Sequence, residues 1–418
     1  MRHATTVRVS QDALDLKDWI RPGDSVVWGQ AGAEPEVITS ALMRQRHEIG
    51  PLTVSIGFSL TPTPNPLYAD CVRFRSYCAS GTNRRLAKEG LLEILPVPYS
   101  TLASVLTPVD VLLLHLPPAG ANGRHNLGVL QEYIAPLIKH ARTVIAEVND
   151  QMPNVSGAID IGGEEINLIV ESSRPVRELV LPEPTETERR IASHVAELVE
   201  DGSVIQMGLG QLPNAILGAL EGHRDLGVHS GVIGDGIVEL IEKGVINNSR
   251  KVHDRGVSVT GWLLGSRRLY DFAHNNDSVK IYPSYYTHNP VVLAEQDRLV
   301  AINSAVEVDL TGQVNAEVAN GQYIGSVGGA AEFLRGAHGS KGGLPIIALP
   351  ATVKKTGASR IVGALAGPVS TPRSEAGIIV TEYGVADLRG RTLSERKRLM
   401  IGIAAPELRA ELQDMSVY

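Results

Sequence analysis

Residues 202–213 read Gly202-Ser203-Val204-Ile205-Gln206-Met207-Gly208-Leu209-Gly210-Gln211-Leu212-Pro213. A short apolar run, a glycine turn and a helical stretch follow one another here, which is typical of a strand that leads into a helix. The same order occurs 178 positions earlier, from Asp24 to Pro35. This repetition predicts two related α/β halves, although a match this short also arises by chance.

Five further segments are apolar and rich in β-branched residues, and helical patterns separate them. They are 109–116, 143–148, 299–302, 345–349 and 377–381. Such runs are typical of parallel strands that are buried on both faces. The sequence therefore predicts an α/β protein with mainly parallel sheets.

The boundary between the two halves is marked by Leu181-Pro182-Glu183-Pro184, which cannot continue a helix. Thr185 and Glu188 then form a capping box, which predicts a new helix directly after the prolines. We place the break near residues 182–186. The predicted domains are an N-terminal domain, 1–182, and a C-terminal domain, 183–418.

The composition argues against several classes of partner and cofactor. The 418 residues suit two domains, and a net charge of −7 without a run of Lys or Arg argues against a nucleic-acid partner. Cys71 and Cys78 have neither CxxC nor His/Cys metal spacing, so we expect reduced thiols and no metal. No signal-peptide core or membrane-length apolar run is present, which predicts a soluble cytoplasmic protein without a membrane partner.

Several motifs occur in a defined order between about residues 20 and 412. They are Ala146-Glu147-Val148-Asn149-Asp150-Gln151-Met152-Pro153, the turn at 207–213, the segment 306–314, Ser326-Val327-Gly328-Gly329-Ala330-Ala331-Glu332-Phe333 and Thr381-Glu382-Tyr383-Gly384-Val385-Ala386-Asp387. In these motifs the chain resembles the acetyl-CoA hydrolase/transferase family, whose best-known members are 4-hydroxybutyrate CoA-transferases.

The resemblance implies two related CoA-transferase-type α/β domains, with the active site in the cleft between them, and a homodimer. It implies coenzyme A as part of the substrate. The expected ligands are an acyl-CoA, or a carrier-bound pantetheine thioester, and a small carboxylate or another acceptor.

One position departs from the family pattern. Family members typically read His-Thr-Glu or Tyr-Thr-Glu where this chain reads His229-Ser230-Gly231, and their Glu is the nucleophile. That Glu attacks the thioester and forms a glutamyl-CoA intermediate, which a glycine cannot do. The resemblance therefore places Gly231 at the position of a missing nucleophile and excludes ordinary transfer through it.

Several chemistries stay open at this centre. Water or an acceptor can attack the thioester directly, polarised by His229 or Asp235. Ser230 can instead carry the acyl group, but adjacent strand residues point to opposite sides, so His229 is poorly placed as its base. Lyase or decarboxylase chemistry would need an acid or base that the sequence does not show. We expect acyl transfer or thioester hydrolysis. The alternatives are a genuine CoA-transferase that uses another carboxylate and a non-catalytic acyl-CoA-binding partner.

Two glycine turns and one lysine are candidates for binding the thioester oxygen or CoA. They are Gly208, Gly210 and Gln211, then Gly328 and Gly329, and finally Lys341. Glycines allow close approach of a ligand to the backbone, and helix starts offer unpaired N–H groups. Tight turns without a ligand, and a solvated loop around Lys341, are the alternatives. The acids inside the motifs, Glu307, Asp309, Glu332, Glu382 and Asp387, are predicted to serve structural pairing or capping.

Overall fold

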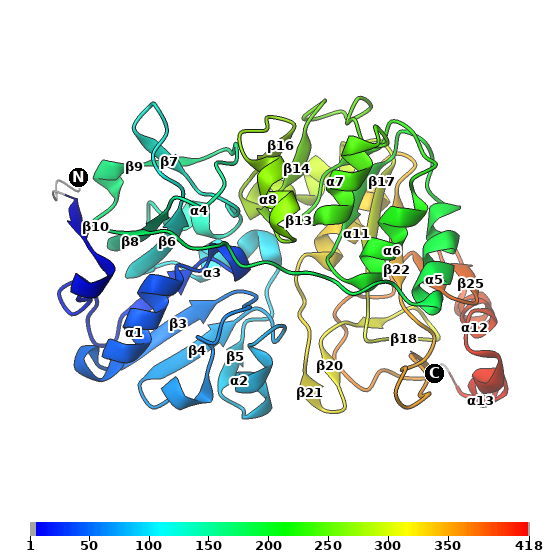
Figure 1. Ribbon diagram of the computed structural model, residues 1–418. Helices are drawn as coiled ribbons and strands as arrows, with labels where there is room; N and C mark the ends of the chain where they lie inside the picture. Colours follow the sequence, from blue (N-terminus) through cyan, green and yellow to red (C-terminus); the bar gives the residue numbers. More distant parts are fainter. Residues whose placement is uncertain (1–5, 417–418) are drawn as a thin grey trace. The chain divides into compact units, whose positions relative to one another are not determined.

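The computed structural model describes residues 6–416 and divides the chain into two compact units (Figure 1). The first unit contains the chain through Leu179 together with a returning segment, Gly261–Tyr286. The second unit contains Val180–Thr260 and the chain from Thr287 onward.

An eight-stranded sheet forms the first unit, in the order β1-β10-β8-β6-β2-β3-β4-β5, and every neighbouring pair is parallel. The strands are β1 (Val7–Val9), β2 (Ser25–Trp28), β3 (Leu52–Ile56), β4 (Val72–Ser76), β5 (Leu92–Ile94), β6 (Val111–Leu116), β8 (Thr143–Asn149) and β10 (Leu168–Ser172). Every residue of β6 and β8 is buried, which explains their nearly continuous apolar sequences.

The helices of the first unit are α1 (Glu36–Ile49), α2 (Arg84–Lys88), α3 (Leu102–Val105), α4 (Ile134–Leu137) and α8 (Arg267–Ala273), and α9 (Ser284–Thr287) begins in it. From β2 the chain passes through α1 to β3, β4 and β5 on one side, then returns to β6 on the other side of β2. The direction of strand addition therefore reverses between β2 and β6, a topological switch point.

The returning segment groups with the first unit although it lies within the predicted C-terminal domain, 183–418. Its backbone is hydrogen-bonded to that unit: the N–H of Gln131 donates to the carbonyl of Gly261, and the N–H of Ala158 donates to Ile281. These contacts join positions more than a hundred residues apart, so no local sequence pattern predicts them.

A six-stranded sheet forms the second unit, in the order β12-β11-β17-β22-β24-β25. The strands are β11 (Val204–Met207), β12 (Gly227–Val228), β17 (Leu299–Asn303), β22 (Leu344–Ala348), β24 (Ile378–Thr381) and β25 (Gly384–Asp387). Only β25 runs antiparallel to its neighbour within this sheet. All five segments that were predicted as parallel strands are confirmed within one or two residues at their ends.

The helices of the second unit are α5 (Glu186–Ala196), α6 (Gln211–Ala219), α7 (Asp235–Glu242), α10 (Pro290–Ala294), α11 (Ala330–Gly339), α12 (Leu393–Gly402) and α13 (Arg409–Asp414). The predicted capping box is confirmed at the start of α5. The Thr185 hydroxyl accepts from the N–H of Glu188, and the Glu188 carboxylate accepts from the N–H of Thr185. Both prolines before it lie outside the helix, as expected.

Short strands complete the structure. They are β7 (Arg124–Asn126), β9 (Asp160–Gly162), β13 (Val232–Ile233), β14 (Ser258–Thr260), β15 (Trp262–Leu263), β16 (Val279–Ile281), β18 (Glu307–Asp309), β19 (Val314–Asn315), β20 (Val318–Ala319), β21 (Gln322–Tyr323) and β23 (Ile361–Val362).

The connections of the second sheet decide where a ligand site can form. The chain moves from β11 through α6 to β12 in one direction, and from β17 through α11 to β22 in the other. Because such crossovers are right-handed, α6 and α11 cover opposite faces of the sheet. The switch point lies between β11 and β17, and Gly208 follows the carboxyl end of β11 there. Ligands in open α/β sheets bind outside the carboxyl ends of strands at such a point.

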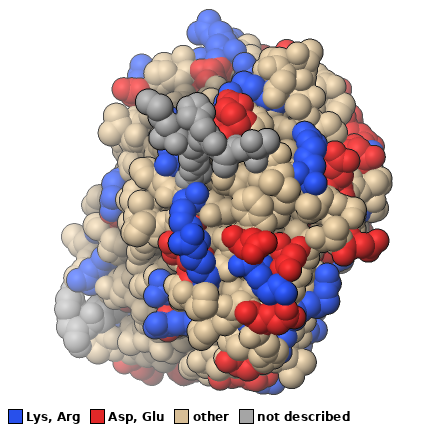
Figure 2. Space-filling view, turned by 90° about the vertical axis from the view of Figure 1, so that its left-hand side faces the viewer, with Lys and Arg blue, Asp and Glu red and all other residues tan. Residues whose placement is uncertain are grey.

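No helix within residues 6–416 combines the length and the apolar character needed to cross a membrane. On the face shown in Figure 2, basic and acidic side chains are interspersed among other residues.

Candidate active site

The carboxyl edge of the second sheet brings two of the predicted motifs together. Strands β11 and β12 pair in parallel with Ile205 opposite Val228, and the N–H of His229 donates to the Ile205 carbonyl at 3.1 Å. The turn that begins at Gly208 and the segment from His229 to Gly231, which we call the 229–231 segment, therefore leave the sheet side by side.

Ser230 ties these two chain segments to each other. Its buried hydroxyl donates to the Met207 carbonyl at 2.8 Å and accepts from the Met207 N–H at 3.2 Å. The hydroxyl proton is thus directed at a backbone oxygen. This geometry is that of a positioning residue, which holds Gly231 next to the start of the Gly208 turn.

His288 fills the space beside two of the predicted glycines. A Cβ atom at position 231 would lie 2.9 Å from the Nε2 atom of His288, and a Cβ atom at position 329 would lie 2.6 Å from it. Both distances are shorter than real Cβ contacts. Gly231 and Gly329 are therefore small because an imidazole ring lies against both of them.

The ring of His288 is held from two sides. Its Nδ1 atom lies 2.9 Å from the hydroxyl of Thr287, and its ring centroid lies 4.6 Å from that of Phe333, a residue of α11. Burial, together with His229 nearby, lowers the pKa of His288 to about 3. The imidazole is therefore neutral at physiological pH. When Nδ1 donates its proton to Thr287, Nε2 keeps its lone pair.

His229 is also buried and neutral. Its Nε2 atom lies 3.2 Å from the Thr287 carbonyl oxygen, and burial followed by the charge of Lys251 lowers its pKa to about 3. Lys251 is itself buried, and its Nζ donates to the carbonyls of Val228 and Val257 at 2.9 and 2.7 Å. His229 and Lys251 therefore hold the end of β12, from which the 229–231 segment continues.

Comparison with known proteins identifies the family. Residues 8–180 match the acetyl-CoA hydrolase/transferase N-terminal domain, and residues 265–416 match the C-terminal domain of the same name. The 4-hydroxybutyrate coenzyme A transferase of Clostridium kluyveri is 40% identical over 348 residues, which cover 82% of this chain and 81% of that protein. The chain belongs to the acetyl-CoA hydrolase/transferase family.

Two further relatives show the range of the acetyl-CoA hydrolase/transferase family. The crystal structure of RipA from Yersinia pestis has a TM-score of 0.93 and 32% identity, and the match covers 98% of this chain and 96% of that one. The acetyl-CoA hydrolase of Saccharomyces cerevisiae is 30% identical over 273 residues, 62% of this chain and 50% of that protein. The predicted two-domain α/β fold is confirmed, and the chain is an enzyme of this transferase and hydrolase family.

The other predicted site residues described next lie at or beside the starts of helices. Gln211 begins α6, and its side chain donates to the Glu183 carbonyl. Gly210 and Gly328 have positive φ angles of 136° and 55°, which favour glycine at these helix starts. Asp235, predicted to polarise the attacking water or acceptor, is the first residue of α7.

Lys341 is not brought to the carboxyl edge. It lies between the end of α11 and the start of β22, at the amino ends of the strands, and borders a charged cavity of about 620 Å³. Charges of both signs line that cavity, including Arg250 and Asp225, which pair at 3.4 Å. Within the second unit, Lys341 is therefore at the opposite edge from Gly208, Gly231 and Gly329.

The acids of the family motifs are engaged by their neighbours, as predicted. Glu307 accepts from the Asn315 side chain, Asp309 accepts from Thr311, and Asp387 pairs with its neighbour Arg389. Glu382 accepts from the N–H of Ala351, and Glu332 is buried in the first turn of α11.

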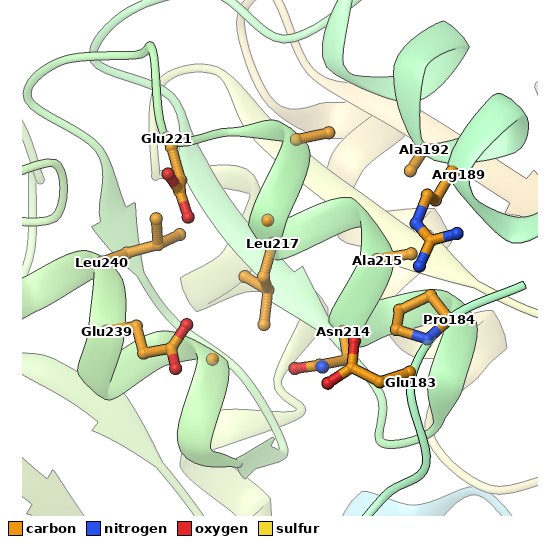
Figure 3. Close-up of a pocket in the computed structure, with 13 residues that line it drawn as sticks. Glu183, Pro184, Arg189, Ala192, Asn214, Ala215, Leu217, Glu221, Glu239 and Leu240 are labelled. Carbon is orange, nitrogen blue, oxygen red and sulfur yellow. The ribbon is translucent and has the colours of Figure 1, made fainter. Parts of the chain in front are cut away.

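A separate cavity of about 400 Å³ lies among α5, α6 and α7 (Figure 3). Arg189 and Asn214 line one side, and Glu221 and Glu239 lie on the other. None of the glycines beside His288 borders it. The predicted site residues and this cavity therefore lie in different places. The motif glycines that contact His288 belong to the predicted site.

Sequence reasoning missed His288. It is a single histidine before the Asn289-Pro290 start of α10, and no motif surrounds it. Its relation to Gly231 and Gly329 exists only after three distant segments have folded together.

Proposed function

We propose that this enzyme transfers the acyl group of an acyl-CoA directly to water or to another acceptor, without a glutamyl-CoA intermediate. The observation that supports this function is the position of the His288 imidazole, whose Nε2 lies 2.9 Å from a Cβ position at Gly231. We expect Gly231 to stand where the nucleophilic glutamate of the family stands. In this chain, a base fills the space in which the carboxylate side chain would lie.

The proposed reaction uses His288 as the general base. Nε2 accepts a proton from water or the acceptor while the oxygen of that nucleophile bonds to the thioester carbonyl carbon. The tetrahedral intermediate then collapses, the carbon–sulfur bond breaks, and the protonated imidazole returns its proton to the CoA thiolate. With water, an acyl-CoA becomes the free acid and CoA, and the histidine is regenerated.

The start of α11 is suited to stabilising the charge that forms on the carbonyl oxygen. Gly329 is the N-cap residue of this ten-residue helix, so the first N–H groups of the helix are free of helical partners. Such groups stabilise an oxyanion by hydrogen bonding and by the positive end of the helix dipole. A side chain at 329 would displace His288, so the same glycine serves both parts of the site.

Two other functions for this chain make different predictions. A genuine CoA-transferase would need a carboxylate other than residue 231, and Glu307, Asp309 and Glu382 are already hydrogen-bonded within the fold. A non-catalytic partner would bind the acyl-CoA without cleaving it. The relatives named as transferases and the relative named as a hydrolase support cleavage of a thioester as the shared chemistry.

The test is an assay of wild type on a panel of short acyl-CoAs, with and without acetate. We expect release of the CoA thiol, no protein-bound CoA ester, and loss of at least about a hundredfold in rate for His288→Asn, because a general base contributes about that much. Exchange of CoA between acyl-CoA and acetate by wild type would favour a transferase with another carboxylate. Thermal stabilisation by acyl-CoA without thiol release would favour a binding partner.

A further inference from the structure

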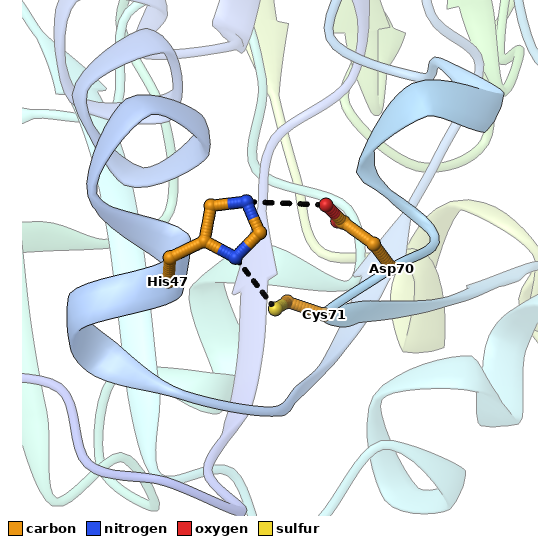
Figure 4. Close-up of side chains that lie close together, drawn as sticks. All are labelled: His47, Asp70 and Cys71. Carbon is orange, nitrogen blue, oxygen red and sulfur yellow. Dashed lines mark hydrogen bonds and ion pairs between the residues drawn. The ribbon is translucent and has the colours of Figure 1, made fainter.

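A second cluster of reactive side chains lies in the first unit, outside the proposed active site (Figure 4). The Sγ atom of Cys71 lies 3.4 Å from Nδ1 of His47, and Nε2 of His47 lies 3.2 Å from Oδ2 of Asp70. His47 is in the last turn of α1, and the other two residues lie directly before β4. The imidazole thus connects a thiol on one nitrogen with a carboxylate on the other.

Arg46 brings one fixed positive charge to this cluster. Arg46 donates through Nε and Nη2 to the two carboxylate oxygens of Asp70, at 2.8 and 2.9 Å, and its guanidinium stacks 5.1 Å above the ring of Tyr68. Cys71 is partly exposed and has the imidazole of His47 within reach of its thiol.

The same three side chains could in principle hold a metal ion, but the contacts argue against it. Arg46 covers both oxygens of Asp70 with a fixed positive charge, so a cation at that carboxylate would be repelled. The carboxylate and the thiol also contact different nitrogens of His47, whereas a shared ion would need both to approach one nitrogen. A proton relay therefore fits the cluster better than a metal site.

We propose that Cys71 is a modification site that exchanges with disulfides of low-molecular-weight thiols. His47 takes the Cys71 proton at Nδ1, and Asp70 stabilises the imidazolium. The thiolate then attacks one sulfur of the disulfide, its sulfur–sulfur bond breaks, and a mixed disulfide forms on Cys71. The departing thiolate takes up the proton, so no external oxidant other than the disulfide is consumed.

Cys78 provides an internal contrast. It is buried, its thiol lies among Ser76 and Asn83, and burial raises its pKa. The relay is absent there. We therefore expect a folded protein with one fast thiol and one slow thiol, and we expect Cys71→Ser to remove only the fast one.

The experiment measures the reaction of the folded protein with an aromatic disulfide reagent, with glutathione as the reference thiol. Cys71 should react roughly tenfold faster than glutathione near neutral pH. His47→Gln should slow the reaction toward the rate of glutathione. Intact-mass analysis after treatment with oxidised glutathione should show one adduct, absent in Cys71→Ser.

Three results would overturn the proposal. They are a Cys71 rate equal to that of glutathione, a rate that His47→Gln leaves unchanged, or a one-to-one zinc complex that His47→Gln abolishes. Thiol release from acyl-CoA in the same preparations tests the proposed function separately, since neither Cys71 nor His47 takes part in it.

Discussion

At the scale of single residues, Gly231 and His288 occupy adjoining space at the carboxyl edge of the second sheet. A glutamate at 231 would have to extend its side chain through the volume that the imidazole occupies, because even a Cβ atom there comes within 2.9 Å of Nε2. The ring itself is buried and packed on Phe333, so a shift of the ring would disturb that packing. A glutamate at 231 would therefore have to displace the ring of His288 from its present position.

This displacement predicts the outcome of restoring the nucleophile. Gly231→Glu alone should give no CoA exchange between acyl-CoA and acetate and should lower stability by about 1–3 kcal/mol, the usual cost of overpacking. The pair Gly231→Glu/His288→Ala should fold better and gain exchange, because the ring no longer fills the space. Chromatography of the CoA esters measures exchange, and His288→Ala alone is the control. Exchange by Gly231→Glu alone, with stability unchanged, would contradict this account.

A second residue-scale prediction concerns Glu132, which the sequence did not single out. Its carboxyl group is buried, accepts from Gln30 and Tyr99 at 2.6 and 2.7 Å, and has a pKa that burial raises to about 8. Because the folded pKa exceeds the unfolded value of about 4.5, its contribution to stability is complete below pH 4.5 and is lost as the pH rises through 8. Glu132→Gln should therefore lose less stability than wild type between about pH 5 and about pH 9.

Urea unfolding at several pH values measures this difference for Glu132. Glu89→Gln, a change of the same kind at an exposed site, is the control and should leave the slope as in wild type. Parallel pH profiles for wild type and Glu132→Gln would show that the carboxyl group is ionised in the folded protein.

At the scale of elements, the sequence predicted what depends on neighbours along the chain. The apolar composition of the segments 143–148 and 299–302 is sufficient to predict buried strands. The capping box at Thr185 needs only residues within one helical turn. The position of His288 depends instead on contacts with residues that follow β12 and residues that begin α11. Both are far away in sequence. Lys341 shows the same limit: its loop has the composition of a phosphate contact, but only the connection from α11 to β22 reveals which edge it occupies.

The start of α11 gives an element-scale prediction. Gly329→Ala would place a Cβ atom 2.3 Å from Cδ2 of His288, so the ring must shift away from its position beside Gly231. We expect thiol release to fall at least about tenfold, because a displaced base loses its geometry for proton transfer. Gly402→Ala, in α12 with open space around the position, is the matched control and should keep full activity. Equal loss in both variants would mean that helix substitution, and not the ring, is responsible.

At the scale of the whole molecule, each unit contains the same arrangement around its switch point. The repeated stretch supplies β2 in the first sheet and β11 in the second, and in both sheets this strand borders the place where the strand order reverses. Strands β2 and β11 thus have equivalent places in the two sheets. The predicted repetition is therefore visible as topology. The returning segment is the exception, because its membership in the first unit rests on backbone pairing that the sequence does not encode locally.

The buried histidines of both units predict how the stability of the protein depends on pH. Burial is the main cause that lowers the pKa of His115 to about 4, and those of His229 and His288 to about 3. Between these values and the unfolded value of about 6.5, the unfolded chain binds more protons than the folded one, so stability falls as the pH falls. Each histidine contributes a slope of about 1.4 kcal/mol per pH unit, whereas Glu132 acts in the opposite direction.

His288→Asn should therefore lose about 2 kcal/mol less than wild type between pH 6.5 and 5, as measured by urea unfolding. His140→Asn, at an exposed site, should follow wild type. If His288→Asn also follows wild type, burial does not lower the pKa of His288 in the folded protein.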